Sequence, residues 1–143
     1  MDQSWKGRRI IQNEDQVTNF LQEQCRTMEI EMEVANFYGD EGSQTSYQEQ
    51  AHFVSRSNIM IGVHGAGLNL AMFMPFDSVV IEIHLNTGVQ KNSQNTIAQL
   101  GGGKYFALYG RKDSAGNLDK VKVWNSLKKA IEWWEAIQRQ HIR

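Results

Sequence analysis

The sequence predicts an α/β domain in which a parallel sheet is covered by helices. Three short apolar runs have the length and composition of buried strands: Asn58–Val63, Asp77–His84 and Lys104–Tyr109. Segments with apolar residues at helical spacing precede, separate and follow these runs. Strands that alternate with helices at such intervals are typical of a parallel sheet with helical connections.

The composition indicates one globular domain. The chain has 143 residues, so we expect a single domain over residues 1–143. The net charge of −1 argues against nucleic-acid binding, which usually shows as a basic excess. No apolar run approaches the roughly 20 residues of a membrane span, and the N-terminus lacks the apolar core of a signal peptide. The single cysteine, Cys25, excludes an intramolecular disulfide and a cysteine-based zinc site, and we expect it in the core.

Helices are expected over five segments: Glu14–Cys25, 46–57, Leu68–Met74, Gln94–Leu100 and about 126–142. Ser46 or Thr45 could cap the second of these helices, and Glu49 three residues after Ser46 would complete a capping box. Pro75 is expected to stop the third, and Ser126 is a candidate cap for the last.

Two further segments show strand-like patterns. Met28–Phe37 alternates apolar and acidic residues with period two, which indicates a half-buried strand. Arg8–Ile11 is basic and then apolar, so it could begin or flank a strand.

The segment Ile61–Leu68, which reads IGVHGAGL, lies where a buried strand should turn into a helix. Gly62, Gly65 and Gly67 cost backbone entropy unless the turn needs positive φ or a close approach. The carboxyl ends of parallel strands are where ligands bind in open α/β sheets. Unpaired amides at the start of the following helix favour an anion such as a diphosphate. His64 could donate a hydrogen bond to a phosphate or sugar oxygen.

Two interpretations of this turn remain open. The spacing is not the G-x-G-x-x-G fingerprint of dinucleotide-binding sites, so that assignment fails. The glycines could bind an anion, or they could only let the helix pack close to the strand. His64 without its context is more often structural than functional.

Glu82 is an acid inside an otherwise apolar strand, where unpaired burial is costly. A carboxylate at such a strand end commonly accepts hydrogen bonds from ribose hydroxyls, although a nearby backbone or basic group is an equally good partner. His84 shares the strand face of Glu82, so a metal site with His64 is conceivable. We expect no metal, because no third ligand has a recognisable spacing. The pattern shows no Ser-His-Asp or Cys-His arrangement.

The stretch from Ile61 to Ile83, IGVHGAGLNLAMFMPFDSVVIEI, resembles glycosyltransferase family 61, and in particular its EGF-domain-specific O-GlcNAc transferase and plant β-1,2-xylosyltransferase members. The run from Arg8 to Asp15 (RRIIQNED) is similar to the R-x-I-I-N-E-x-E-L element of that family. Glu49-Gln50 precedes the histidine at the usual distance, and Tyr105 stands where a tyrosine often follows the acidic strand. The likeness covers about residues 8–109.

The resemblance implies a Rossmann-like parallel sheet with helices on both faces, forming one lobe of a GT-B fold. It implies an inverting enzyme that takes a sugar, N-acetylglucosamine or a pentose, from a UDP-sugar and uses no cofactor. The expected partners are this donor and a glycan or glycoprotein acceptor. Carried over by position, the donor side consists of Arg8, Arg9, His64, Gly65, Ala66, Gly67, Leu68, Asn69 and Glu82.

Family members usually carry another lobe before the arginine element and work in the lumen of the endoplasmic reticulum or Golgi. This chain begins almost at Arg8, so we expect a donor-binding lobe that is weakly active or inactive by itself, with the general base outside it. Within the chain, His64 is the one weak candidate for a catalytic group. The alternatives are a non-catalytic nucleotide- or anion-binding module and a purely structural or interaction domain.

Overall fold

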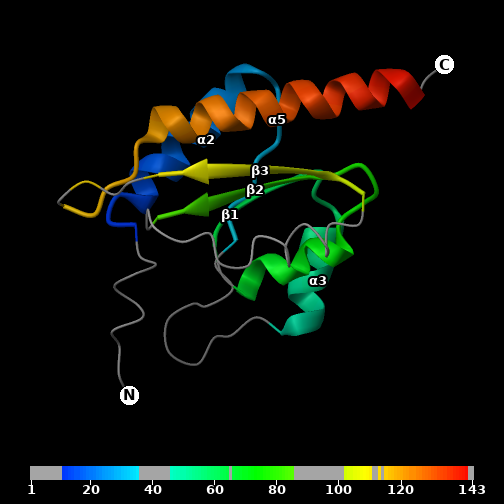
Figure 1. The fold of residues 1–143 in the computed structure, drawn as a ribbon, viewed down its shortest axis with the longest axis horizontal. Coiled ribbons are helices and arrows are strands. Elements are labelled where there is room, and N and C mark those ends of the chain that lie inside the picture. Colours follow the sequence, from blue (N-terminus) through cyan, green and yellow to red (C-terminus); the bar gives the residue numbers. More distant parts are fainter. Residues whose placement is uncertain are drawn as a thin grey trace.

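The computed structural model describes residues 11–35, 46–64, 66–85, 102–110, 113 and 115–141. Along the chain these form α2 (Glu14–Thr27), α3 (Tyr47–Ser55), β1 (Ile59–Val63), the 3₁₀ helix η1 (Ala66–Phe73), β2 (Val79–His84), β3 (Lys104–Tyr109) and α5 (Lys120–His141) (Figure 1). The three strands form one parallel sheet in the order β1-β2-β3. The predicted α/β class and all three predicted strands are therefore confirmed.

Helices cover both faces of the sheet, as predicted. The helices α2 and α5 lie on one face, and α3 and η1 lie on the other (Figure 1). The central strand β2 is buried along its whole length, which explains why its sequence is almost continuously apolar.

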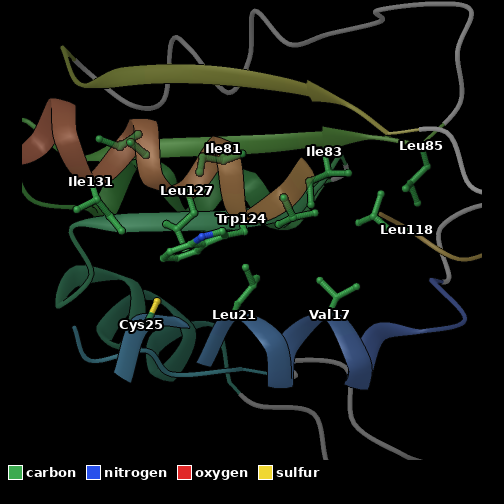
Figure 2. Packing of buried hydrophobic residues seen from close by; sticks show 13 residues of the cluster. Val17, Leu21, Cys25, Ile81, Ile83, Leu85, Leu118, Trp124, Leu127 and Ile131 are labelled. Atoms are coloured by element: carbon green, nitrogen blue, oxygen red, sulfur yellow. The ribbon is translucent and has the colours of Figure 1, made fainter. Parts of the chain in front are cut away.

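The larger core lies between the sheet and the pair α2 and α5 (Figure 2). Val79, Ile81 and Ile83 point from β2 toward these helices, because alternate residues of a strand share one face. The helices contribute most of the other members of this core, which include Val17, Leu21, Cys25, Trp124, Leu127 and Ile131. The core position expected for Cys25 is confirmed, and burial raises the pKa of its thiol, which disfavours the reactive thiolate.

A smaller core on the opposite face joins Leu68 and Ala71 of η1 to Val80 of β2. The packing is close: a Cβ atom added at Gly62 would lie 2.7 Å from Leu68 Cδ2. For Gly62, the interpretation that a glycine lets the helix approach the strand is thus supported.

Two predicted helix caps can be compared with the structure, and the first helix begins at Glu14 as predicted. Ser46 caps α3 as predicted, because its Oγ accepts a hydrogen bond from the Glu49 amide at 3.1 Å. The last helix begins at Lys120 rather than near residue 126, so Ser126 is not its cap. Asp119 takes this place instead, because its Oδ1 accepts from the Val121 amide at 2.9 Å.

The strand predicted over Met28–Phe37 is wrong for the residues that the structure describes. Residues 30–35 belong to no strand, yet Ile30 and Met32 pack against the core while Glu31 and Glu33 are exposed. Met28 and Val34, on the same alternating face, are 44% and 50% exposed, so the alternation predicted the buried side chains only in part, and the backbone makes no strand pairing there.

The remaining predictions have mixed outcomes. The helix expected at Leu68–Met74 is the 3₁₀ helix η1, and it ends at Phe73, two residues before Pro75. The helix predicted over Gln94–Leu100 and residues 8–10 of the predicted Arg8–Ile11 element lie outside the described residues. Among the described helices, none combines the length and apolar character needed to cross a bilayer.

Candidate functional site

Polar side chains gather at the carboxyl edge of the sheet, on the face that η1 covers. His64 follows β1 directly, and its amide donates to the Ile83 carbonyl at 2.8 Å, which prolongs the strand pairing. Glu82 and His84 lie two residues apart in β2 and thus share one face. The register neighbours of Glu82 are Gly62 and Ala107, whose small size leaves room for its carboxylate.

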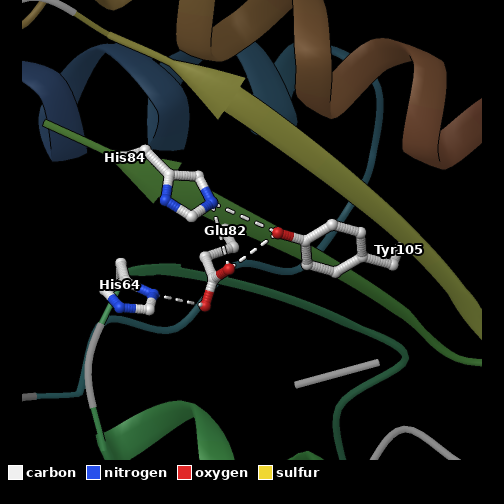
Figure 3. Close-up of polar contacts among 4 residues, drawn as sticks. All are labelled: His64, Glu82, His84 and Tyr105. Atoms are coloured by element: carbon white, nitrogen blue, oxygen red, sulfur yellow. Dashed lines mark hydrogen bonds and ion pairs between the residues drawn. The ribbon is translucent and has the colours of Figure 1, made fainter. Parts of the chain in front are cut away.

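The Glu82 carboxylate is the centre of this cluster (Figure 3). Its side chain is 0% exposed, and three neighbours contact its oxygens. The Tyr105 hydroxyl donates to Oε1 at 2.6 Å, His64 Nδ1 lies 3.2 Å from Oε2, and His84 Nε2 lies 3.1 Å from Oε1. A buried carboxylate is stable only when such partners replace its hydration.

The rings at this edge stack in a row that crosses the sheet. His84 stacks on His64 with ring centroids 5.2 Å apart, and on Tyr109 of β3 at the same distance. His84 is nearly buried, with 6% of its surface exposed. The side chain of His64 is 35% exposed, and its second ring nitrogen, Nε2, points away from Glu82 (Figure 3). Of the three acid and imidazole groups, His64 is therefore the one that a ligand can reach.

The structure brings together two of the predicted site residues, His64 and Glu82. The Glu82 carboxylate is fully buried and contacted by His64, His84 and Tyr105, and its contact with a ribose hydroxyl stays a prediction. The alternative of a nearby protein partner, which the sequence left open, is the one observed.

The other predicted site residues differ in how well they can be placed. Arg8, Arg9 and Gly65 lie outside the described residues. The backbone of Ala66 and Gly67 forms the first turn of η1. Leu68 is 4% exposed and packs in the smaller core, so its side chain faces the protein, whereas the side chain of Asn69 is exposed.

Tyr105 and Tyr109 also belong to this cluster, although neither was predicted as a site residue. The hydroxyl of Tyr105 lies 3.2 Å from His84 Nε2 as well as beside Glu82. Tyr105 pairs with Val80, which lies two residues before Glu82 on the same face of β2. The side chain of Tyr105 is long enough for its hydroxyl to reach the Glu82 carboxylate. No local pattern signals this contact, because it depends on how β3 pairs with β2.

The sequence predicts no metal, because no third ligand has a recognisable spacing, although a site with His64, Glu82 and His84 is conceivable. The structure brings one ligand atom of each of these residues within 4.8 Å of the other two. These three residues are thus the described group that could hold an ion.

A separate cavity of about 820 Å³ lies on the opposite face of the sheet, beside β1 and between α2 and α5. Its walls are largely core side chains, and its charged lining residues are Arg56 and four acids: Glu14, Glu31, Glu33 and Glu135. This excess of acids disfavours a phosphorylated ligand. The carboxyl edge with His64 remains the better candidate site.

Comparison with known proteins identifies the family. The model of the family described as Glycosyltransferase 61 matches residues 3–81, which is more than half of the chain. The match includes β1, His64 and η1, and it ends directly before Glu82. No curated protein and no solved structure matches the chain. On the strength of this match, the chain belongs to glycosyltransferase family 61.

Proposed function

We propose that this chain is the donor-binding lobe of an inverting glycosyltransferase of GT-B architecture, with a UDP-sugar as donor. The transferred sugar is N-acetylglucosamine or a pentose, and the acceptor is a glycan or glycoprotein. Membership of the family supports a sugar donor and an acceptor. The three-stranded parallel sheet with helices on both faces supports a nucleotide-binding lobe.

One observation carries the proposal: an accessible imidazole is held in place at the carboxyl edge of the sheet. His64 is fixed at Nδ1 by the buried carboxylate of Glu82, and its Nε2 points away from that contact. When both ring nitrogens are protonated, Nδ1 donates to Glu82 and Nε2 is left to donate to a phosphate oxygen of the donor. The amides of the first turn of η1 begin two residues later and favour the same anion.

In this proposal the residues of the cluster have different roles. His64 contacts the diphosphate, while Glu82 and Tyr105 are positioning residues that set the orientation of its ring. Leu68 anchors η1 to the sheet, and the exposed Asn69 lies on the same helix within the first turns. Arg8 and Arg9 remain proposed donor contacts on the strength of the resemblance.

The direct test measures UDP binding to the purified chain by calorimetry and by thermal unfolding. A ligand that binds only the folded state raises its stability by about 2.7 kcal/mol at 100 times Kd. We therefore expect UDP to raise the unfolding midpoint. A folded chain whose midpoint does not move with millimolar nucleoside diphosphate would contradict the proposal.

The variant His64→Asn isolates the role of the outward nitrogen. The amide nitrogen of Asn lies close to where Nδ1 was, so it can keep the contact with Glu82, but nothing replaces Nε2. We expect the Kd for UDP to rise about 10- to 150-fold, which corresponds to the roughly 1.5–3 kcal/mol of a hydrogen bond to a charged group. His52→Asn, at an exposed position in α3, is the matched control.

The same variant separates a donor contact from a catalytic base. A general base needs Nε2 without its proton, whereas a phosphate contact needs Nε2 with it. Transfer is measured from labelled UDP-N-acetylglucosamine and UDP-xylose. If His64→Asn binds UDP normally but loses transfer, His64 is the base and its donor contact is refuted. Binding without transfer by the unaltered chain fits both a donor-binding lobe that is inactive by itself and the non-catalytic nucleotide-binding module.

A further inference from the structure

Two imidazoles and one carboxylate converge at the carboxyl edge of the sheet. His64 Nδ1 and His84 Nε2 lie 3.2 Å and 3.1 Å from the two oxygens of Glu82. We propose that His64, Glu82 and His84 bind one divalent transition-metal ion, for which zinc is the best-suited candidate. This proposal does not depend on the binding of a nucleotide sugar.

The donor set suits zinc. Two histidine nitrogens and one glutamate oxygen are a three-ligand set that zinc adopts when a fourth position stays open. Zinc bonds of about 2.0–2.1 Å place neighbouring ligand atoms roughly 3.3 Å apart in a tetrahedron. Each histidine nitrogen lies at about this spacing from one carboxylate oxygen, His64 Nδ1 from Oε2 and His84 Nε2 from Oε1. The three ligand atoms lie within 4.8 Å of one another. The largest closure that a tetrahedral site needs is therefore about 1.5 Å.

The surroundings hold the ligands in place. Tyr105 donates to Glu82 Oε1 at 2.6 Å, which fixes the carboxylate in the way that outer hydrogen-bond partners fix metal ligands. His84 is held between the rings of His64 and Tyr109. Two of the ligands, Glu82 and His84, are therefore buried and preorganised before an ion arrives.

Access is provided by the third ligand. The side chain of His64 is 35% exposed, so an ion can enter from its side and keep its open position toward solvent. A metal on Nδ1 also leaves Nε2 of His64 protonated and directed outward. The same cluster serves as a hydrogen-bond network when imidazole N–H groups face Glu82. The metal and those protons compete for the same nitrogen atoms.

The test uses the full chain without a histidine tag, stripped of metal by a chelator. Zn²⁺ is titrated by calorimetry, the bound metal is counted by elemental analysis after desalting, and Co²⁺ reports the coordination through its visible spectrum. We expect one Zn²⁺ per chain, a Co²⁺ spectrum typical of four-coordinate nitrogen and oxygen ligation, and no binding of Mg²⁺, which prefers oxygen ligands.

Variants assign the ion to this cluster. His84→Ala and His64→Asn each remove one ligand, and we expect either to lower the Zn²⁺ affinity at least about 100-fold, while Tyr105→Phe lowers it roughly 10- to 100-fold. His64→Asn keeps an amide beside Glu82, so it retains the fold even if His84→Ala does not. The matched control replaces the two other histidines, His52 and His141, by Ala and must bind Zn²⁺ as tightly as the unaltered chain.

Two results would overturn the proposal: failure of the unaltered, folded chain to bind Zn²⁺ or Co²⁺, or binding that survives both His64→Asn and His84→Ala. Neither result bears on UDP binding, which is measured in the metal-free chain. Failure of the metal site and failure of the proposed function are thus distinguishable.

Discussion

The hydroxyl of Tyr105 provides the sharpest test of how the buried cluster is held together. It donates to Glu82 Oε1 at 2.6 Å and lies 3.2 Å from His84 Nε2. Tyr105→Phe removes this one oxygen atom and keeps the ring, which packs against the smaller core around Leu68 and Val80. The variant therefore changes a hydrogen bond to a buried carboxylate and leaves the apolar packing intact.

The expected cost follows from the nature of the acceptor. A hydrogen bond to a charged group contributes about 1.5–3 kcal/mol to the free energy of unfolding, against roughly 0.5–1.5 kcal/mol for a neutral acceptor. Tyr105→Phe should thus lose about 1.5–3 kcal/mol. For a chain of this length, 1 kcal/mol corresponds to about 4 °C, so the unfolding midpoint should fall by roughly 6–12 °C.

The assay is urea denaturation followed by circular dichroism, with Tyr47→Phe as the matched control. Tyr47 is 61% exposed, so loss of its hydroxyl should change the stability by less than about 0.5 kcal/mol. In a Glu82→Gln background the acceptor is neutral, and there Tyr105→Phe should cost only about 0.5–1.5 kcal/mol. Equal stability of Tyr105→Phe and Tyr47→Phe would refute a stabilising role for this contact.

Two further predictions concern packing and acid stability. Gly62→Ala places a methyl group 2.7 Å from Leu68 Cδ2 and should destabilise the chain by about 1–3 kcal/mol in urea denaturation. The double variant Gly62→Ala/Leu68→Ala should recover part of this stability. An unchanged midpoint for Gly62→Ala would show that Leu68 moves aside freely. The pKa of Asp113 is lowered by the hydrogen bond from the Asn117 amide, and also by those from the Asn117 side chain and the Ala115 amide. The ionised carboxylate therefore stabilises the fold above about pH 4. This stabilisation is lost as the pH falls through the lowered pKa of the folded state. Asp113→Asn should therefore flatten the fall of the unfolding midpoint between about pH 4 and pH 2, and a fall identical to that of the unaltered chain would contradict this role.

Much of the framework was predictable from local sequence patterns. The apolar runs that end at Val63, His84 and Tyr109 form the three strands. The run in β2 is the most continuous, because this central strand is buried on both faces. Ser46 caps α3 because a cap needs only its own side chain and the amide three residues later. Such features depend on neighbours within one turn or one strand, so the sequence contains them in full.

Pairing and depth of burial could not be obtained in this way. The alternation over Met28–Phe37 predicted the core contacts of Ile30 and Met32 but not the exposure of Met28 and Val34. Residues 30–35 have no strand pairing, because pairing needs a partner with the right register. The start of α5 at Lys120 likewise follows from the cap at Asp119, which the sequence analysis did not consider.

The candidate site likewise combines features that local sequence patterns predict with contacts that only the folded structure reveals. By itself, the sequence determined that Glu82 and His84 share one strand face and that His64 follows the neighbouring strand, since both depend on a period of two and on chain order. Only the tertiary structure decided that Glu82 is fully buried, that Tyr105 reaches it from β3 and that His64 closes the cluster from β1. These contacts join residues 18 and 23 positions apart, and the register between three strands sets their distances. Register is a property of the whole sheet, so no local pattern could specify it.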